Sequence, residues 1–492
     1  MRQLLSRLTR LTLGYGVVQW SGPFLALLFT PVITRLVSPD DYGVADYIQT
    51  IGSAVGMLAL LAQPQALAAH FNDQPDEAWR RRVTSSALTV SMALGLPLGA
   101  LLFSLAPQLS LATFGDPQHT PLFQLIGATA VFGISSTILT AAAQAALRVR
   151  WGMALSLTNI GAIVTGNIVF LILLRLGVTG LILTPILAAV AVSLTALILM
   201  RSLLGAPSWP VLKTLAISGA TLLPTMLSGW ALTLLDRLFL VYYVSTEALG
   251  YYAIANKIAA LAHVAMTPLY SSWMALALSI QHDPAAKERY ATMARYLIAA
   301  ALSVSLGLGI FATEVLIILT RPAYLPAAPY VGLLAYVHVF TGFGTVLYTS
   351  ALAGKQLMAV SWTVGTGALI NLILNFALIP SFGLWGATIA TVVGYGVPQI
   401  LLYWLLQKRY PVPYPLKPLL AALAVHFVLL LVSTFVPSWA FTLRVGAKLG
   451  LLAILPLTFL ALGVITRLEL QQGLALARSQ ARRLLARLQS QP

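Results

Sequence analysis

Two basic side chains inside long apolar runs are the residues of this chain most able to do chemistry. Arg237 lies in an apolar run over residues 214–243, and Lys257 lies in the run that follows. An ionisable side chain inside a membrane-spanning segment costs about 2.5–3.5 kcal/mol to insert, so each one needs a reason to be there. A guanidinium matches phosphate oxygens as a fork, and an ammonium is a compact point charge. The pair predicts a site for an anionic, phosphate-bearing ligand.

Each cation also has a structural interpretation. Arg237 follows Asp236, so the two can form an ion pair near the outer surface, and the sequence leaves both interpretations open. Lys257 can extend its ammonium to the membrane–water interface instead of a cavity. Arg35 ends the first apolar run, and simple interfacial placement is the better interpretation of it.

Uncharged polar residues accompany these cations at helical spacing. Tyr252, Asn256 and His263 share one predicted helix face with Thr267 and Tyr270. A second line joins Thr221, Thr225 and Asp236. A polar face on a membrane helix turns to a cavity or another helix rather than to lipid, so both lines are expected at a cleft. The candidate substrate-binding residues are Arg237, Lys257, Arg35, Asn256, His263, Tyr252 and Thr225.

Carboxylates, amides and imidazoles inside the runs are fewer. Asp236 and Asp46 are candidates for ion coupling, as is Glu314, although Asp46 and Glu314 can equally lie at the interface. Asn371 and Asn375 are one helical turn apart and fit interhelical hydrogen bonding. The histidines, His263, His338 and His426, are scattered, so the sequence predicts no metal site and no cofactor.

Composition places these residues in a membrane protein. Of 492 residues, 59% are apolar and only 9% are charged, which excludes a soluble globular chain. Runs of about 20 apolar residues recur along the whole length and predict about fourteen transmembrane helices. Most of the 29 basic residues fall in alternate connections, which predicts cytoplasmic N- and C-termini. The net charge of +16 is therefore a topology signal and not a nucleic-acid site.

A short connector occurs twice. "VSPDDYG" at 37–43 aligns without a gap on "VSTEALG" at 244–250, which places Gly43 on Gly250. Two further matches, 147–156 with 352–361 and 176–181 with 382–387, follow at nearly the same offset. Six predicted spans separate the copies, and an even number preserves orientation, so the repeats are parallel. In each connector the serine suits a helix start and the glycine suits a close approach or a tight turn.

The repeat predicts the domain organisation. The expected fold is an all-α polytopic membrane protein with two parallel six-helix lobes around a central cavity and two additional C-terminal helices. The lobes span residues 1–213 and 214–417, and the two further spans lie within 418–466. Residues 467–492 place leucine and alanine on one helix face and arginine on the other, which predicts an amphipathic basic tail on the cytoplasmic leaflet.

Three segments carry a family resemblance. Residues 30–47 (TPVITRLVSPDDYGVADY), 234–259 (LLDRLFLVYYVSTEALGYYAIANKIA) and the "FGLWGA" turn resemble the polysaccharide-transporter branch of the MOP exporter superfamily. That branch contains Wzx-type flippases. The resemblance implies a flippase that moves a polyprenyl-pyrophosphate-linked oligosaccharide from the cytoplasmic to the outer leaflet by alternating access, for cell-surface polysaccharide synthesis. It also implies a bacterial plasma membrane, and membrane lipid and other polysaccharide-assembly membrane proteins as partners.

Other functions compete with this one. A lipid II-type flippase carries the same pyrophosphate head, and a multidrug or cation antiporter shares the fold. An antiporter needs carboxylates deep in the cleft, whereas the first span has none and Arg237 and Lys257 favour an anionic substrate. A membrane enzyme, such as a glycan polymerase, needs acids or bases outside the membrane. Outer loops such as 107–121 and 321–329 are short and contain only Asp116 among acidic residues, so we expect a transporter and not an enzyme.

Overall fold

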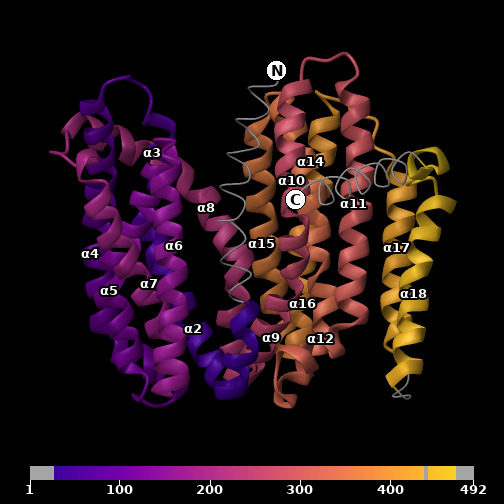
Figure 1. Ribbon diagram of the computed structural model, residues 1–492, viewed down its shortest axis with the longest axis horizontal. Helices are drawn as coiled ribbons and strands as arrows, with labels where there is room; N and C mark the ends of the chain where they lie inside the picture. Colours follow the sequence, from indigo (N-terminus) through magenta and orange to yellow (C-terminus); the bar gives the residue numbers. More distant parts are fainter. Residues whose placement is uncertain (1–26, 437–440, 472–492) are drawn as a thin grey trace, which may run out of the picture. The chain divides into compact units, whose positions relative to one another are not determined.

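The computed structural model describes residues 27–436 and 441–471 (Figure 1). Every regular element in those residues is a helix. In the first part of the chain these are α2 (Pro39–Leu60), α3 (Gln63–His70), α4 (Glu77–Phe114), α5 (Thr120–Ala145), α6 (Val149–Gly166), the π-helix η1 (Asn167–Leu173), α7 (Gly177–Leu199), η2 (Arg201–Leu203) and α8 (Trp209–Tyr243). They follow a shorter apolar helix, Leu27–Leu36.

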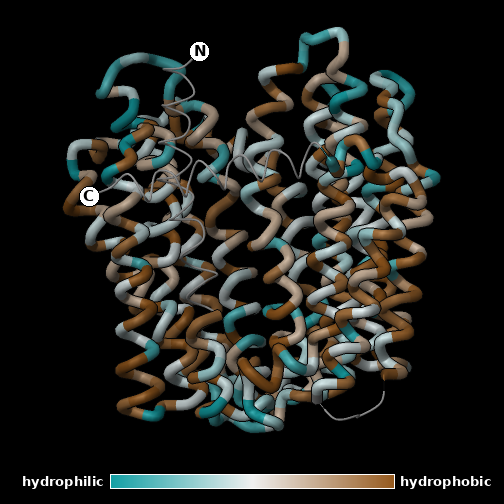
Figure 2. Tube along the Cα trace, turned by 45° about the vertical axis from the view of Figure 1, so that its right-hand side comes forward, coloured by the Kyte–Doolittle hydropathy of each residue, from teal (hydrophilic) through white to brown (hydrophobic). Residues whose placement is uncertain are grey.

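The second part of the chain continues the same pattern. Its elements are α9 (Thr246–Ala259), α10 (Leu261–Ile280), α11 (Ala286–Ile310), α12 (Ala312–Leu319), η3 (Pro322–Ala327), α13 (Ala328–Leu334), α14 (Tyr336–Ala353), α15 (Leu357–Phe382), α16 (Leu384–Gln407), α17 (Leu416–Ser433) and α18 (Phe441–Ala461). Figure 2 shows that apolar residues dominate the helices, while polar residues gather at many helix ends and connections. The prediction of an all-α polytopic membrane protein is confirmed.

Twelve helices in the described residues are long and apolar enough to cross a membrane. Two of the fourteen predicted spans are not among them. The first, at 11–34, lies mostly outside the described residues, as does Pro23 within it. The eighth, at 249–280, is divided into α9 and α10 around Ala260. The predicted tail also lies outside the described residues from 472 onward.

The repeated connectors start helices as predicted. Ser38 is the N-cap of α2, and its hydroxyl accepts a hydrogen bond of 3.0 Å from the backbone N–H of Asp41. Ser245 precedes α9, and its hydroxyl accepts a hydrogen bond of 3.0 Å from the N–H of Ala248. Each serine thus satisfies one of the backbone donors that a helix start leaves free.

The two connectors also contact each other, and the contact is reciprocal. A Cβ built on Gly43 would lie 1.8 Å from the carbonyl oxygen of Thr246, and one built on Gly250 would lie 1.8 Å from that of Pro39. Pro39 aligns with Thr246 just as Gly43 aligns with Gly250, so each copy presents the same pair of features. The glycines therefore permit a close approach rather than a turn. The side chain of Thr246 donates a hydrogen bond to the carboxylate of Asp40 across this contact.

The chain forms two compact units. The N-terminal unit comprises residues up to 258 together with 314–330 and 361–398. The C-terminal unit comprises 259–313, 331–360 and 399 onward. The two units are defined by the contacts within each of them and not by the sequence repeat. The repeat-based lobes at 1–213 and 214–417 stay a prediction.

The core of the N-terminal unit is built from α3 to α7. Phe71, Val83, Ile138 and Leu139 are all fully buried in one cluster there. A second cluster places Ile48 of α2 against α4, α5 and α7. This packing holds α2 in place, and with it the connector at the start of the helix and Asp46 one turn before Thr50.

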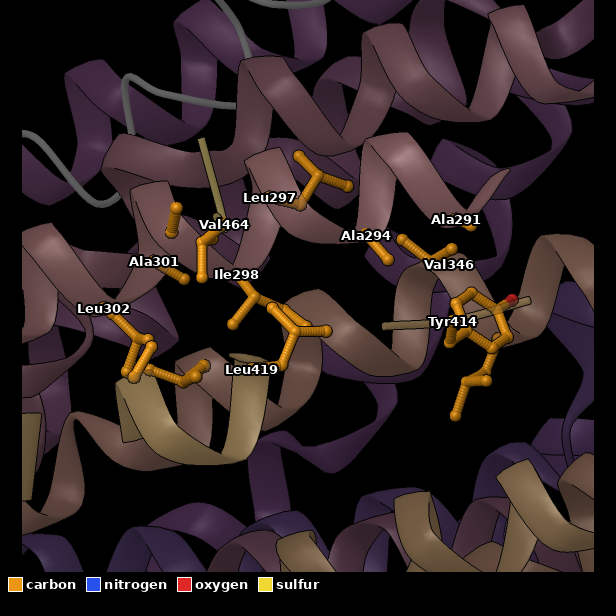
Figure 3. Close-up of a cluster of buried hydrophobic side chains, with 14 of the residues drawn as sticks. Ala291, Ala294, Leu297, Ile298, Ala301, Leu302, Val346, Tyr414, Leu419 and Val464 are labelled. Carbon is orange, nitrogen blue, oxygen red and sulfur yellow. The ribbon is translucent and has the colours of Figure 1, made fainter. Parts of the chain in front are cut away.

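The core of the C-terminal unit follows α11. Figure 3 shows side chains of α11, among them Leu297, Ile298 and Leu302, gathered with Leu419 of α17. The small residues Ala294 and Ala301 are also buried on this helix. Small side chains let membrane helices approach closely, which accounts for the dense packing around α11.

Candidate functional site

Arg237 forms an ion pair inside the N-terminal unit, and its partner is distant in sequence. Its Nε donates a hydrogen bond of 2.5 Å to Oδ2 of Asp46, which joins α8 to α2. Its Nη1 donates to the carbonyl oxygen of Thr233 at 2.7 Å. The Arg237 side chain is 12% exposed and that of Asp46 is 24% exposed. Nη2 makes no hydrogen bond with the described residues, so one edge of the guanidinium fork stays available.

Asp236, the sequence neighbour of Arg237, is held differently. It is 2% exposed, and its Oδ1 lies 3.9 Å from Nη1 of Arg237. Its Oδ2 accepts hydrogen bonds from the Tyr252 hydroxyl and from Oγ1 of Thr391, the latter at 3.1 Å. Tyr252 and Thr391 also contact each other at 2.9 Å. This network ties α8 to α9 and α16, and it occupies one oxygen of the carboxylate.

Lys257 lies at a cavity of about 220 Å³ in the same unit. Its Nζ is 5.2 Å from the ring centre of Tyr42, a distance at which an ammonium is attracted to an aromatic face. Asp46 also lines this cavity, and Gln49, Asn167 and Thr184 add uncharged polar groups. We call it the Lys257 pocket. Lys257 forms no salt bridge with the described residues. Unlike Arg237, it is therefore not paired with a carboxylate in this site.

A π-helix contributes to the wall of the Lys257 pocket. Asn167 is the first residue of η1, which continues α6 by seven residues. Its side-chain amide donates to the carbonyl oxygen of Ile163 at 2.9 Å. π-Helical turns are rare and frequently occur at functional sites.

The structure brings four of the predicted residues together and leaves others apart. Asp46, Arg237, Asp236 and Tyr252 form one connected cluster, and Asp46 also shares the Lys257 pocket with Lys257. The remaining residues of the N-terminal unit are placed as follows: Arg35 is exposed at the end of the helix Leu27–Leu36, and Thr225 on α8 and Asn256 on α9 are half-buried.

The predicted polar face after Tyr252 falls on two helices. Tyr252 and Asn256 are on α9, whereas His263, Thr267 and Tyr270 are on α10 of the C-terminal unit. His263 is exposed there, and its ring centre lies 5.6 Å from that of His338. His263 and His338 are 75 residues apart in the sequence but neighbours in the structure. The histidines are therefore less scattered than the sequence indicates.

The amide pair on α15 bonds within its own helix. Nδ2 of Asn375 donates to Oδ1 of Asn371 at 3.1 Å, and both side chains are buried. Nδ2 of Asn371 and Oδ1 of Asn375 make no hydrogen bond with the described residues. The interhelical bond predicted from the sequence is thus replaced, in this structure, by an intrahelical one.

Sequence reasoning missed Thr391 and Tyr395. Both are on α16, where Tyr395 approaches the hydroxyl of Thr233 at 3.1 Å and Thr391 reaches Asp236. They stand singly in "GATIATVVGYG", and a lone hydroxyl in an apolar helix gives no signal of its partner. Tyr42 was likewise hidden within the repeated connector.

The chain matches a family model over residues 32–329, more than half its length, and that family is described as polysaccharide biosynthesis protein. An uncharacterized membrane protein of Methanocaldococcus jannaschii is 38% identical over 99 residues, which are 20% of this chain and 19% of that protein. The match therefore spans about a fifth of that relative's length.

Solved structures share the fold. The lipid II flippase MurJ, in an inward closed conformation, aligns with a TM-score of 0.67 at 16% identity, over 91% of this chain and 98% of that one. An inward-facing multidrug resistance MATE family transporter of the MOP superfamily aligns with a TM-score of 0.65 at 15% identity, over 80% and 94%. At such identities the likeness concerns the fold alone.

Proposed function

The chain belongs to the polysaccharide biosynthesis protein family, in the polysaccharide-transporter branch of the MOP superfamily, and from this premise we propose that it is a lipid-linked oligosaccharide flippase. Its substrate is a polyprenyl-pyrophosphate-linked oligosaccharide, which it moves from the cytoplasmic to the outer leaflet. The sugar head crosses by alternating access while the polyprenyl tail stays in the bilayer.

The observation that carries this proposal is the position of Lys257. It faces a cavity inside membrane-spanning helices and has no salt bridge to the described residues. An unpaired charge in such surroundings is costly, so a phosphate entering the cavity supplies the missing counter-ion. Asp46 lines the same cavity and already holds Arg237, whose free Nη2 can add a second contact to the diphosphate.

The same contacts speak against a cation antiporter. Asp46 is paired with Arg237, and Asp236 accepts hydrogen bonds from Tyr252 and Thr391. Neither carboxylate is free to hold a drug cation without first giving up its present partners. Release of Asp46 from Arg237 when phosphate binds is the route by which Asp46 takes part in ion coupling.

Flipping in proteoliposomes tests the proposal. A polyprenyl-pyrophosphate oligosaccharide is placed in both leaflets, and the access of an external sugar-modifying enzyme to the inner pool is followed over time. A charge-assisted hydrogen bond to phosphate contributes about 1.5–3 kcal/mol, so Lys257→Gln should slow flipping about ten- to hundredfold. Arg237→Gln combined with Lys257→Gln should abolish it.

Lys213→Gln is the matched control, because Lys213 is an exposed cation near the start of α8, outside the site. It should leave the rate unchanged. Unchanged flipping in the double variant would contradict the assignment of the two cations. Transport of cationic dyes in place of the glycolipid would favour the antiporter, and preference for lipid II over other glycans would favour a lipid II flippase.

A further inference from the structure

Two larger cavities continue the Lys257 pocket within the N-terminal unit. One has a volume of about 620 Å³ and the other about 580 Å³. Gln49 and Pro185 line both the Lys257 pocket and the first of them. Pro64, Thr137 and Pro185 line both larger cavities. Because they share lining residues, the three cavities are neighbours, and we call them together the α5–α6 groove after the far end.

The order of lining residues gives the direction and length of this groove. On α7 the lining moves from Leu181 at the Lys257 pocket to Val192 at the far cavity. At 1.5 Å per residue this is about 17 Å along the helix. A groove of this length spans more than one sugar ring.

Charge is confined to one end of the groove. Lys257 and Asp46 line the Lys257 pocket, whereas the two larger cavities have no Asp, Glu, Lys, Arg or His among their lining residues in the described chain. Their polar residues are hydroxyls and amides: Gln49, Ser53, Gln65, Thr129, Ser136, Thr137, Thr140, Gln144, Ser156 and Asn159. The groove therefore combines one charged end, which holds Lys257 and Asp46, with an uncharged length where hydroxyls and amides are set among apolar residues.

Four of these side chains have spare hydrogen-bonding capacity. Thr140 and Gln144 are one turn apart on α5, and Ser156 and Asn159 are one turn apart on α6. None of the four makes a side-chain hydrogen bond with the described residues. By contrast, Thr137 donates to the carbonyl oxygen of Gly133 in its own helix at 2.8 Å.

We propose that the α5–α6 groove binds an uncharged oligosaccharide, with the diphosphate at Lys257 and the sugar hydroxyls on these four side chains. This inference rests on the proposed function and deepens it by defining the class of glycan. Sugar hydroxyls both donate and accept, which matches hydroxyl and amide groups. A uronic acid would place a carboxylate in a neutral groove without a cation, at a desolvation cost that selects against acidic glycans.

The first test compares three glycolipids in the flipping assay: polyprenyl pyrophosphate carrying one neutral sugar, a neutral tetrasaccharide or an acidic tetrasaccharide. Wild type should flip the neutral tetrasaccharide at least about tenfold faster than the acidic one. Gln144→Leu combined with Asn159→Leu should slow the neutral tetrasaccharide about thirtyfold, since two hydrogen bonds of about 1 kcal/mol each are lost and about 1.4 kcal/mol is a factor of ten, and leave the single sugar within twofold.

The matched control is Thr214→Val, which removes an exposed hydroxyl of α8 that donates to the carbonyl oxygen of Pro210 in its own helix and lines none of the three cavities, and it should change neither rate beyond twofold. Thr140→Val combined with Ser156→Ala is a second variant pair should the first fail to fold. Binding of the free neutral tetrasaccharide, read as a rise in melting temperature that the variants lack, is independent of flipping.

The outcomes separate the two proposals. If wild type flips no polyprenyl-pyrophosphate glycan, the proposed function fails, and the melting shift alone decides whether the groove binds sugar. If all three glycolipids are flipped equally and the variants behave as wild type, the function stands and the groove assignment is overturned. Equal loss for the single sugar and the tetrasaccharide would also overturn it, because the four side chains would then not act on the glycan.

Discussion

The two units differ in how their buried polar groups are connected. In the N-terminal unit Asp46, Arg237 and Asp236 are connected across several helices, and cavities lie beside them. In the C-terminal unit polar groups occur as separate pairs, such as His426 with Tyr336 at 2.5 Å, set in the apolar packing around α11. A cavity of about 430 Å³ in that unit lies at residues 403–414, where no charged residue lines it.

This difference between the two units bears on where a ligand can bind. Charged groups that must meet a ligand need space and spare hydrogen-bonding capacity, and the N-terminal unit provides both. Pairs such as His426 and Tyr336 stiffen a packed core. Under the function proposed above, the comparison favours the N-terminal unit as the part of the chain that binds the substrate.

Removing the carboxylate of the N-terminal cluster should give the largest effect. Asp46→Asn removes the closer counter-ion of the nearly buried Arg237 and leaves only Asp236, whose Oδ1 lies 3.9 Å from Nη1, which we expect to cost about 3 kcal/mol of stability. Thermal unfolding of the purified protein measures this change. Combining it with Arg237→Gln should recover most of the loss, because the uncompensated charge is then gone. Equal stability of the single and double variants would mean that the pair does not stabilise the unit.

Closing the connector contact should give the next effect. Gly43→Ala places a methyl group on the Thr246 carbonyl, so α2 and α9 must separate, at about 2 kcal/mol. Gly250→Ala should cost a similar amount, and the two together less than their sum, because both open the same contact. Gly56→Ala on α2 is the control, since a Cβ there meets nothing within 4 Å. Since alanine is favoured over glycine inside a helix, Gly56→Ala should be neutral or stabilising, and a loss as large as that of Gly43→Ala would show that the connector contact is not the cause.

The smallest effect should come from the ion pair of the C-terminal unit. Arg295 Nη2 lies 2.8 Å from Oε1 of Glu469, which follows α18. Burial alone would raise the pKa of Glu469, but the Thr466 N–H, the hydroxyls of Tyr296 and Thr466, and Arg295 outweigh it and lower the pKa from 4.5 to about 2. A lowered pKa stabilises the fold above pH 4.5, and this contribution is lost as the pH falls towards 2.

Glu469→Gln should therefore lose about 1 kcal/mol at neutral pH, because both side chains of the pair are partly exposed and solvent screens their attraction. The melting temperature of the variant should fall less than that of wild type between pH 5 and pH 3. Flipping at neutral pH should be unaffected. A variant whose melting temperature keeps the full acid dependence of wild type would rule out Glu469 as its source.

Local features of this chain were predictable from sequence. The family resemblance is confirmed, and Ser38 and Ser245 cap the helices they were predicted to start, since capping depends on neighbours in sequence. The glycines of the connectors were identified by type and position. Their contact with each other depends on how α2 and α9 pack, and the sequence alone did not predict it.

Long-range partners were not predictable. Asp236 is adjacent to Arg237, yet the guanidinium bonds to Asp46, 191 residues away, because helix packing and not sequence proximity brings the two together. The division of the eighth span around Ala260 has no proline or glycine at that point to announce it. The four polar residues of the α5–α6 groove look like ordinary helix residues until the cavity beside them is known.

The reciprocal contact between the connectors has a consequence for the history and the engineering of the chain. The glycine of each copy lies against a backbone carbonyl of the other copy, so the contact surface is self-complementary. A half-length chain with one copy would carry both sides of the contact and would pair with an identical partner through it. This chain holds the self-complementary contact inside one polypeptide, where neither copy can gain a side chain without displacing the other.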